Sequence, residues 1–316
     1  MGKEKTELSS FLIDIKPQTT IVCEEIIERL NQRLKEHLFT TAYNNIGMFF
    51  QQRQSAPNFQ LDSFAHYEQF SSGNCIGLTL GLIQHILNYC RNWEAIMRLP
   101  PMYVIPATLP SHYERTEEFG HVALLVACSD GLILLDSGFH LHQGIVLKND
   151  EEVSLSVGDK TWRFRLEQQI HPVDKKILRG TIQASVETSR FGREQFQYTL
   201  RHISNPDGII LKRNMVDARR VSYVRRDWDG LQTNHVTVCL REQSIKMAFL
   251  KKDRISYQKI ELSFTECHHA GLDFYLQLYG CPPSLVRQIS SLIQPYIQSP
   301  TAELAEKNPI IIRALG

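Results

Sequence analysis

The 316-residue sequence lacks an excess of charge of either sign and lacks long apolar runs. Its 35 Lys and Arg residues face 34 Asp and Glu residues, which leaves a formal charge of +1. This balance argues against a nucleic-acid scaffold or a polybasic membrane anchor, which need clustered positive charge. No uninterrupted apolar run reaches about 18 residues, so no membrane span is expected. The polar run Met1–Glu7 does not lead into the apolar core of a secretory signal.

Cysteine pairs are also missing. The number of cysteines is odd, and none is spaced as CxxC: Cys23, Cys75, Cys90, Cys128, Cys239, Cys267 and Cys281. This spacing predicts neither a disulfide framework nor a zinc site. We therefore expect most of these residues to be small buried hydrophobes in a reducing compartment, the cytosol, and we expect no metal site.

Hydrophobic residues make up 42% of the chain and charged residues 22%, which is enough to bury a sizeable core. The first part of the chain, to about Arg98, has the period of helices. Two runs of apolar residues follow a helical spacing: Val22, Ile26, Leu30, Leu34 and Leu38, then Leu78, Leu82, Ile83, Ile86, Leu87 and Cys90. Thr19 and Thr20 are candidate N-caps for the first helix.

Pro100-Pro101 breaks the helical pattern, and strand-like alternation follows. Strands are expected at Met102–Ile105, Val122–Cys128, Leu132–Leu135, Val153–Val157 and Trp162–Leu166. This section is typical of an antiparallel sheet or a small barrel, whereas residues 173–220 show no clear pattern. From about Val221, strands at Val236–Leu240, Ile245–Leu250 and Ile260–Phe264 give way to helical spacing after Leu272.

Cys75 lies where the second helical run begins. A thiol at a helix start meets free backbone N–H groups and the positive end of the helix dipole, and both favour the nucleophilic thiolate. The same N–H groups can hold an oxyanion, and Gly73 lets a substrate approach the backbone closely. The alternative interpretation is a small buried residue at a helix start.

His121 and Asp136 stand at the open end of one predicted hairpin, so both can serve the same site. Direct opposition of the two residues centres the turn between Cys128 and Ser129. A tight turn on Asp130-Gly131 would instead place Asp136 opposite Leu125, so that contact needs a longer or bulged turn. Both registers put the two side chains on one face of the hairpin. A carboxylate there can orient an imidazole that deprotonates a thiol, although a surface histidine and a turn aspartate remain the alternative.

The order Cys75, His121, Asp136, with Asp136-Ser137-Gly138-Phe139 after the hairpin, resembles the arylamine N-acetyltransferase family. That family carries R-G-G-x-C-x-E-x-N at its cysteine and D-V-G-F at its aspartate. The segment 37–46 is similar to the family's histidine followed by P-F-E-N-L, with Asn45 retained. Further along, residues 144–166 resemble the family's barrel, and residues 272–282 resemble its closing helix.

The sequence departs from the family pattern around the cysteine. Ser71-Ser72 replaces the family's Arg-Gly, Gly77 replaces its Glu and Thr79 replaces its Asn. Such groups normally support one another, so their joint replacement predicts a rebuilt lining that is smaller and less polar. We therefore expect an acyl group or acceptor that is bulkier or more apolar than acetyl and a simple arylamine.

The resemblance implies an α+β fold in three parts: a helical bundle with Cys75 (residues 1–98), a central antiparallel β-barrel with His121 and Asp136 (99–220), and a C-terminal α/β lid (221–316). It implies a cysteine-dependent N-acyltransferase that forms an acyl-Cys75 intermediate and carries no permanent cofactor. Acyl-CoA or an acyl-carrier thioester would be the donor and a small-molecule amine the acceptor. Four residues are expected to contact substrate: Gly73, Asn74, Tyr113 and Phe139.

Two other functions remain open from the sequence. A transglutaminase-like amidase or deamidase shares the Cys-His-Asp order and would act on a protein or peptide. A non-catalytic binding protein on an enzyme scaffold is the second, because the residues around Cys75 have changed. Basic clusters near Arg220 and Lys251 fit the phosphates of coenzyme A as well as they fit ordinary solvated surfaces.

Overall fold

The computed structural model describes residues 12–15, 19–46, 49, 62–91, 99–108, 119–157, 160–170, 177–188, 192–204, 220–254, 256–269, 272–278 and 281–298. Its contacts divide the chain into two compact units that are each discontinuous in sequence. The first unit comprises Met1–Thr40, Cys75–Ile210 and Trp228–Leu231. The second comprises Thr41–Asn74, Leu211–Asp227 and Gln232–Gly316.

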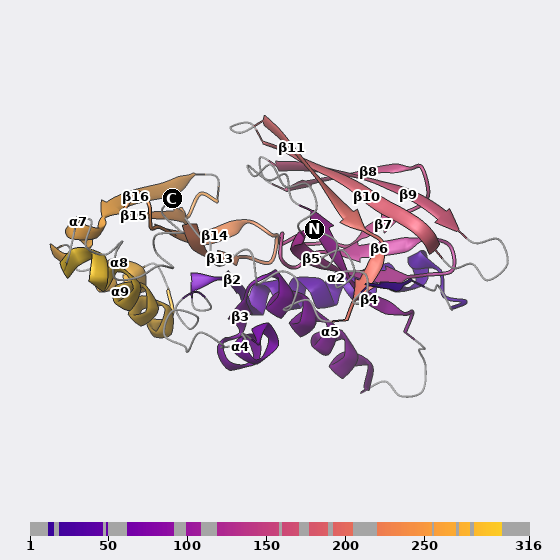
Figure 1. Ribbon diagram of the computed structural model, residues 1–316, viewed down its shortest axis with the longest axis horizontal. Helices are drawn as coiled ribbons and strands as arrows, with labels where there is room; N and C mark the ends of the chain where they lie inside the picture. Colours follow the sequence, from indigo (N-terminus) through magenta and orange to yellow (C-terminus); the bar gives the residue numbers. More distant parts are fainter. Residues whose placement is uncertain are drawn as a thin grey trace, which may run out of the picture. The chain divides into compact units, whose positions relative to one another are not determined.

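The first unit is built on an eight-stranded antiparallel sheet in the order β7-β6-β5-β4-β11-β10-β9-β8 (Figure 1). Its strands are β4 (Met102–Thr108), β5 (Phe119–Ala127), β6 (Leu132–Leu135), β7 (Ile145–Leu147), β8 (Glu152–Val157), β9 (Lys160–Ile170), β10 (Ile177–Thr188) and β11 (Gly192–Thr199). Asn149, just after β7, forms a bridge to Leu166 of β9, so the sheet curls until its two edges nearly meet. The result is a nearly closed barrel. A short pair, β1 (Leu12–Asp14) and β12 (Arg201–Ile203), completes the strands of this unit.

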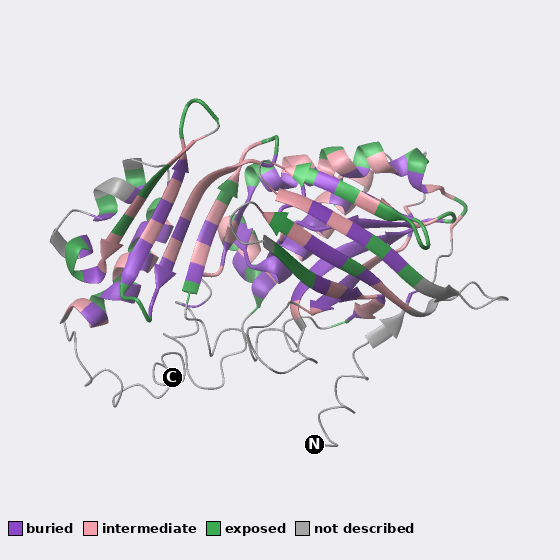
Figure 2. Ribbon diagram, turned by 90° about the horizontal axis from the view of Figure 1, so that it is seen from above, coloured by how far each residue is buried: buried purple, intermediate pink, exposed green. Residues whose placement is uncertain are grey.

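Strands β5 and β6 are buried on both faces, which explains their almost unbroken apolar sequence. One face, with Ala123, Leu125 and Leu134, joins the core inside the barrel. The other face, with Leu124 and Ile133, packs against two helices, α2 (Cys23–Thr40) and α5 (Cys75–Arg91). On β8 to β10, by contrast, buried and exposed residues alternate as bands along each strand (Figure 2).

The second unit contains a six-stranded sheet in the order β16-β15-β14-β13-β2-β3. Its strands are β2 (Ala42–Asn44), β3 (Ser72–Gly73), β13 (Arg220–Arg226), β14 (Gln232–Cys239), β15 (Ser244–Leu250) and β16 (Tyr257–Ser263). Its helices are α4 (Ser63–Phe70), α7 (Phe264–His269), α8 (Leu272–Leu278) and α9 (Pro283–Gln298). The C-terminal helices supply residues such as Leu276 and Ile289 to the core beneath β13 to β15.

The α+β fold class predicted from the sequence is confirmed, with N-terminal helices, a barrel-like antiparallel sheet and C-terminal helices. Residues 173–220, which showed no clear pattern in the sequence, contain the long strands β10 and β11 and the short strand β12. The polar outer faces of β10 and β11 dilute the apolar signal. Among the described helices, none is both long enough and apolar enough to cross a membrane.

The compact units differ from the three consecutive stretches expected from the sequence. Residues 42–44 form a strand that pairs with β13, where Asn44 lies opposite Tyr223. This pairing joins part of the N-terminal stretch to the C-terminal sheet, so the helices α2 and α4 belong to different units. The division into three domains therefore stays a prediction.

Candidate active site

Cys75 is the first residue of α5, as the helical spacing predicted, and only 6% of it is exposed. Asn74 directly precedes the helix, at the position where a polar side chain suits the free N–H groups of the first turn. Neither Asp nor Glu stands in that first turn, so no nearby helix carboxylate opposes negative charge on the sulfur. The thiol therefore lies at the electropositive end of a 17-residue helix.

His121 and Asp136 meet through the register of β5 and β6. Leu124 pairs with Leu135, so the position of Asp136 falls opposite Ala123, two residues from His121 on the same face. The connection spans residues 128–131, and a bond from the Cys128 N–H to the Gly131 carbonyl, 3.0 Å, closes it around Ser129-Asp130. This register lies between the two considered from the sequence, and His121 and Asp136 meet as diagonal neighbours without direct opposition or a longer turn. His121 Nε2 and Asp136 Oδ2 are 2.7 Å apart.

Asp136 is completely buried and is held by two further donors. The Tyr198 hydroxyl donates to Asp136 Oδ2 at 2.6 Å, and the Phe139 N–H donates to Oδ1 at 2.7 Å. Burial and the neighbouring carboxylate raise the pKa of Tyr198 well above 10. The phenol therefore remains a proton donor to Asp136 throughout the neutral range.

The His121 imidazole is 3% exposed, and its pKa is raised to about 10. Burial alone lowers this pKa, but the charge of Asp136 and its hydrogen bond raise it, with further contributions from a hydrogen bond and charge interaction with Cys75. Because Nε2 faces Asp136, the other nitrogen, Nδ1, is the one left to exchange a proton with the thiol. The arrangement stabilises an imidazolium next to the sulfur.

Gly138 packs directly against both Cys75 and His121, and its lack of a side chain leaves room for them. A Cβ atom built on it would lie 2.6 Å from Cε1 of His121 and 2.8 Å from Cβ of Cys75. Both distances are shorter than real Cβ contacts, so any larger residue would push the thiol and imidazole apart. Only the glycine lets residues 75, 121 and 138 pack together at this end of the barrel.

Phe139 lies parallel to the imidazole, with ring centroids 3.9 Å apart and an interplanar angle of 22°. Behind it, Trp162 and Phe196 pack at centroid distances of 5.4 Å and 5.0 Å. The stacked Phe139 ring fixes the plane of His121, and part of Phe139 is exposed. Its expected contact with substrate stays a prediction.

No protein-family model matches the sequence, and no curated protein matches it either. Solved structures do. The arylamine N-acetyltransferase from Mycobacterium abscessus matches with a TM-score of 0.54 and 12% identity, over 85% of this chain and 88% of that one. The enzyme from Salmonella typhimurium gives a TM-score of 0.54 and 13% identity, over 85% and 92%. The enzyme from Nocardia farcinica gives 0.51 and 14%, over 82% and 84%. The chain has the arylamine N-acetyltransferase fold.

Within this arylamine N-acetyltransferase fold, the residues that replace the Arg-Gly of the family pattern have structural partners in the second unit. Ser71 ends α4 in the left-handed conformation, φ 47°, and donates its N–H to the Tyr67 carbonyl. Ser72 pairs with Ala42, and its hydroxyl accepts a bond from Asn44 Nδ2 at 3.3 Å. Thr79 is fully buried, and its hydroxyl lies 3.5 Å from the Val122 carbonyl. The side chains of Ser72 and Thr79 thus each lie within reach of a polar partner.

The remaining sequence candidates are placed as follows. Gly73 is the last residue of β3 and is buried, as is Asn74. Tyr113 lies outside the described residues. In the basic clusters, Arg220 pairs with Glu242 at 2.6 Å and Arg254 with Asp227 at 2.6 Å, so these two arginines already have carboxylate partners. Substrate contact by Gly73, Asn74 and Tyr113 stays a prediction.

Tyr198, which donates a hydrogen bond to Asp136, is the residue of the candidate site that the sequence analysis missed. It lies on β11, in the stretch without a readable pattern, 62 residues from Asp136. A tyrosine in an alternating strand has the same pattern whether its hydroxyl is buried or exposed, so no local signal could have found it. Gly138 did carry a signal, because it is the glycine of the D-x-G-F segment.

Proposed function

We propose that this chain is a cysteine-dependent N-acyltransferase that moves an acyl group from a thioester to an amine. The observation that carries the proposal is the placement of Cys75, at a helix start, beside an imidazole that is bonded to a buried carboxylate. The arylamine N-acetyltransferase fold supports the same reaction class. Acyl-CoA or an acyl-carrier thioester is the proposed donor.

In the first half-reaction, Nδ1 of His121 takes the proton of the Cys75 thiol. The thiolate forms a bond to the thioester carbonyl carbon, and backbone N–H groups at the start of α5 bind the oxyanion. The carbon–sulfur bond of the donor then breaks, and the leaving thiolate takes the proton from His121. The products are acyl-Cys75 and one equivalent of free donor thiol.

In the second half-reaction, a small-molecule amine attacks the acyl-Cys75 carbonyl. His121 accepts the proton that the amine loses and returns it to the Cys75 sulfur as the new amide leaves. Asp136 stays ionised throughout and stabilises the imidazolium of each step. No permanent cofactor takes part in the scheme.

The acyl group proposed for this site is larger or more apolar than acetyl. Two features support the proposal. The first is Thr79, which is fully buried, stands where the resembled family has a larger amide, and has its hydroxyl 3.5 Å from the Val122 carbonyl. Phe139, backed by Trp162 and Phe196, adds apolar surface next to His121. A medium-chain acyl-CoA should therefore acylate Cys75 faster than acetyl-CoA, a difference that intact-protein mass spectrometry measures directly.

The test of the reaction is acylation of wild type, Cys75→Ser and the matched control Cys90→Ser. Wild type and Cys90→Ser should gain one acyl mass and release one equivalent of thiol, while Cys75→Ser should show neither. Transfer to an added amine should then regenerate the unmodified mass. Failure of every thioester, combined with release of ammonia from glutamine peptides, would replace the proposal with a transglutaminase-like amidase. A Cys75 thiol inert to both reagents would leave a binding protein.

A further inference from the structure

Cys23 and Cys128 are neighbours in the first unit although they are far apart in the sequence. Both thiols are free, both residues are only 2% exposed, and a hydrogen bond joins the two side chains. Two sulfur atoms in such contact can form a disulfide after small rotations of their side chains. The proposed acyl transfer uses neither of them.

The start of α2 and the β5–β6 turn are held together on either side of this thiol pair. The Ser129 N–H donates to the Ile21 carbonyl at 2.9 Å, and the Ser129 hydroxyl donates to the same carbonyl at 3.1 Å. The Cys23 N–H donates to Asp130 Oδ1 at 2.7 Å. A Cβ atom built on Gly131 would lie 3.3 Å from the Cys23 sulfur, so this thiol packs directly against the turn. The folded backbone therefore keeps the two thiols in contact.

The thiol pair is buried but lies close to the surface. Ser129 and Asp130, which follow Cys128, are exposed, and so is Glu24, which follows Cys23. Local opening of an exposed turn takes little free energy compared with unfolding of the core. A small neutral oxidant such as hydrogen peroxide can therefore reach the two sulfur atoms.

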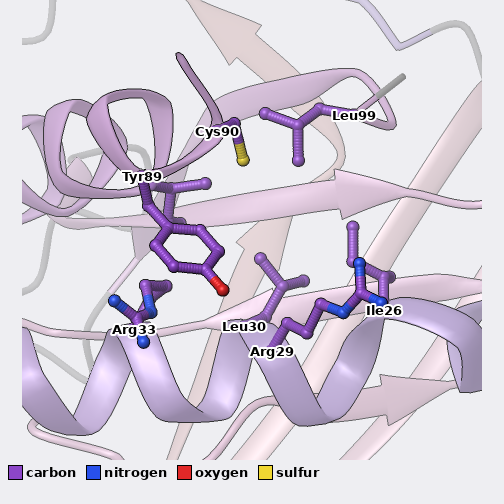
Figure 3. Close-up of a pocket in the computed structure, with 8 residues that line it drawn as sticks. Ile26, Arg29, Leu30, Arg33, Tyr89, Cys90 and Leu99 are labelled. Carbon is purple, nitrogen blue, oxygen red and sulfur yellow. The ribbon is translucent and has the colours of Figure 1, made fainter. Parts of the chain in front are cut away.

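The other cysteines outside the candidate active site have no thiol neighbour among the described residues. Cys90 lines a small hollow between α2 and α5, where side chains such as Arg29 and Tyr89 surround it and no second cysteine is present (Figure 3). Three more cysteines lie in the second unit, and burial, without any contribution from another thiol, is the main cause of their raised pKa: Cys239, Cys267 and Cys281. The close pair is thus a particular feature of Cys23 and Cys128.

The two thiols of the pair differ in how readily they ionise. The hydrogen bond from Cys23 lowers the pKa of Cys128, although burial and the charge of Asp130 act to raise it. The same hydrogen bond raises the pKa of Cys23. Cys128 is therefore the thiol that ionises first, and the thiolate is the form that reacts with a peroxide.

We propose that hydrogen peroxide converts Cys23 and Cys128 into a disulfide that joins the start of α2 to the β5–β6 turn. The Cys128 thiolate attacks one oxygen of the peroxide, the O–O bond breaks, and a sulfenic acid and hydroxide form. The Cys23 thiol then loses its proton as its sulfur forms the S–S bond, and the S–O bond of Cys128 breaks with release of water. In total, the pair of thiols and one peroxide give one disulfide and two water molecules. The reaction is independent of the proposed acyl transfer.

Peroxide treatment of the full-length Cys75→Ser protein tests the proposal, since this variant lacks the thiol of the candidate active site. After the remaining thiols are blocked with iodoacetamide in denaturant, peptide mass spectrometry should find a cross-link between Cys23 and Cys128 that dithiothreitol removes. Cys239→Ser in the same background is the matched control and should form the cross-link at the same rate. Recovery of Cys23 and Cys128 as free thiols, or equal cross-linking of other cysteine pairs, would overturn the proposal.

The order of attack is tested with single variants of the pair in the same background. In Cys23→Ser the serine hydroxyl can still donate to Cys128, so dimedone should trap Cys128 as a sulfenic acid. In Cys128→Ser, dimedone should label Cys23 at least fivefold more slowly. Labelling of Cys23 as fast as that of Cys128 would overturn the assignment of Cys128 as the attacking thiol.

The effect of the bond on the fold is measured by thermal unfolding. A disulfide that closes a loop of about 100 residues stabilises the folded state, mainly because it restricts the unfolded chain. The cross-linked protein should therefore melt at least about 5 °C above the reduced protein, and dithiothreitol should abolish the difference. An equal or lower melting temperature of the cross-linked protein would show that the bond does not fit the native contact of α2 with the turn, and would overturn the proposal.

Discussion

Asp136 accepts hydrogen bonds from three groups while it is completely buried: Nε2 of His121, the hydroxyl of Tyr198 and the N–H of Phe139. Replacement by Asn keeps the shape but removes the charge that stabilises the imidazolium. Asp136→Asn should therefore slow single-turnover acylation of Cys75 at least about a hundredfold. The control is Asp150→Asn, an exposed carboxylate in the same unit, which should keep the wild-type rate. A wild-type rate in Asp136→Asn would remove His121–Asp136 from the mechanism.

Tyr198 makes a charge-assisted bond to the same carboxylate, 2.6 Å long. Tyr198→Phe leaves Asp136 with one donor fewer in a site without solvent. Hydrogen bonds to charged groups contribute about 1.5–3 kcal/mol, so the free energy of unfolding should fall by about that amount. Urea unfolding of the two proteins measures the difference; a loss below about 0.5 kcal/mol would mean that another group replaces the phenol.

Gly138 is the third residue whose identity matters by itself, because Cys75 and His121 flank it. Gly138→Ala places a methyl group within 3 Å of both side chains and should abolish acylation while the chain still folds. Ser137→Ala is the matched control in the same turn. It removes a buried hydroxyl that has no hydrogen-bond partner among the described residues, so acylation should continue and stability should not fall. Full activity of Gly138→Ala would show that the thiol and imidazole need not approach this closely.

Among the elements, α2 shows how a helix start is fixed from a distance. The sequence suggested Thr19 or Thr20 as its N-cap, and this is wrong. The helix begins at Cys23, and the Cys23 N–H donates to Asp130 Oδ1 at 2.7 Å, across 107 residues. The Thr19 hydroxyl instead accepts from the Ile21 N–H at 3.1 Å, ahead of the helix. The β5–β6 turn therefore caps α2.

Removal of this cap gives a prediction for the element. Asp130→Ala should lower the free energy of unfolding by about 1 kcal/mol, the usual cost of losing an N-cap acceptor and its charge at a helix start. Asp130→Asn keeps an acceptor oxygen and should lose less than half of that. Chemical unfolding of the three proteins decides the point, and equal losses in both variants would show that charge alone stabilises the start of α2.

For the molecule as a whole, two buried histidines make the free energy of unfolding depend on pH in opposite directions. Interactions with Asp136 and Cys75 outweigh burial and raise the pKa of His121 to about 10, above its ordinary 6.5. The protonated form is thus favoured by folding, and this stabilisation is complete below pH 6.5 and lost as the pH rises toward 10. His37 behaves in the opposite way, because burial lowers its pKa to about 3. Its contribution is complete above pH 6.5 and lost as the pH falls toward 3.

We therefore expect the free energy of unfolding to be largest near neutral pH. It should fall at alkaline pH because of His121 and at acid pH because of His37. The free energy of unfolding should fall by up to about 1.4 kcal/mol per pH unit on each flank from one such group. In His121→Gln, the free energy of unfolding should fall less steeply at alkaline pH and be unchanged in its slope at acid pH. In His37→Gln, the slope should become shallower at acid pH and stay unchanged at alkaline pH. Urea unfolding between pH 4 and 10 measures both, and a slope that is the same in wild type and variant would contradict the assigned pKa direction.

The sequence by itself determined the class of the fold and most of its elements. Apolar residues at helical spacing predicted α2 and α5, because side-chain period follows directly from backbone geometry. Short apolar runs separated by turn residues after Pro100-Pro101 predicted β4, β5 and β6. Because side chains alternate between the two faces of a strand, residues 121 and 136 were predicted to lie on one face of the hairpin in both registers considered. The helix start at Cys75 was also readable, since it depends only on local spacing.

Only the tertiary structure decided which of these pieces meet. The four-residue connection set the register at Leu124–Leu135, and that register brings His121 to Asp136. Tyr198 reaches the carboxylate from a distant strand, and β2 pairs with β13 across most of the chain. Contacts of this kind depend on where the barrel curls and which strands become neighbours. Period and propensity are local, so they say which face a side chain lies on but not what lies opposite it.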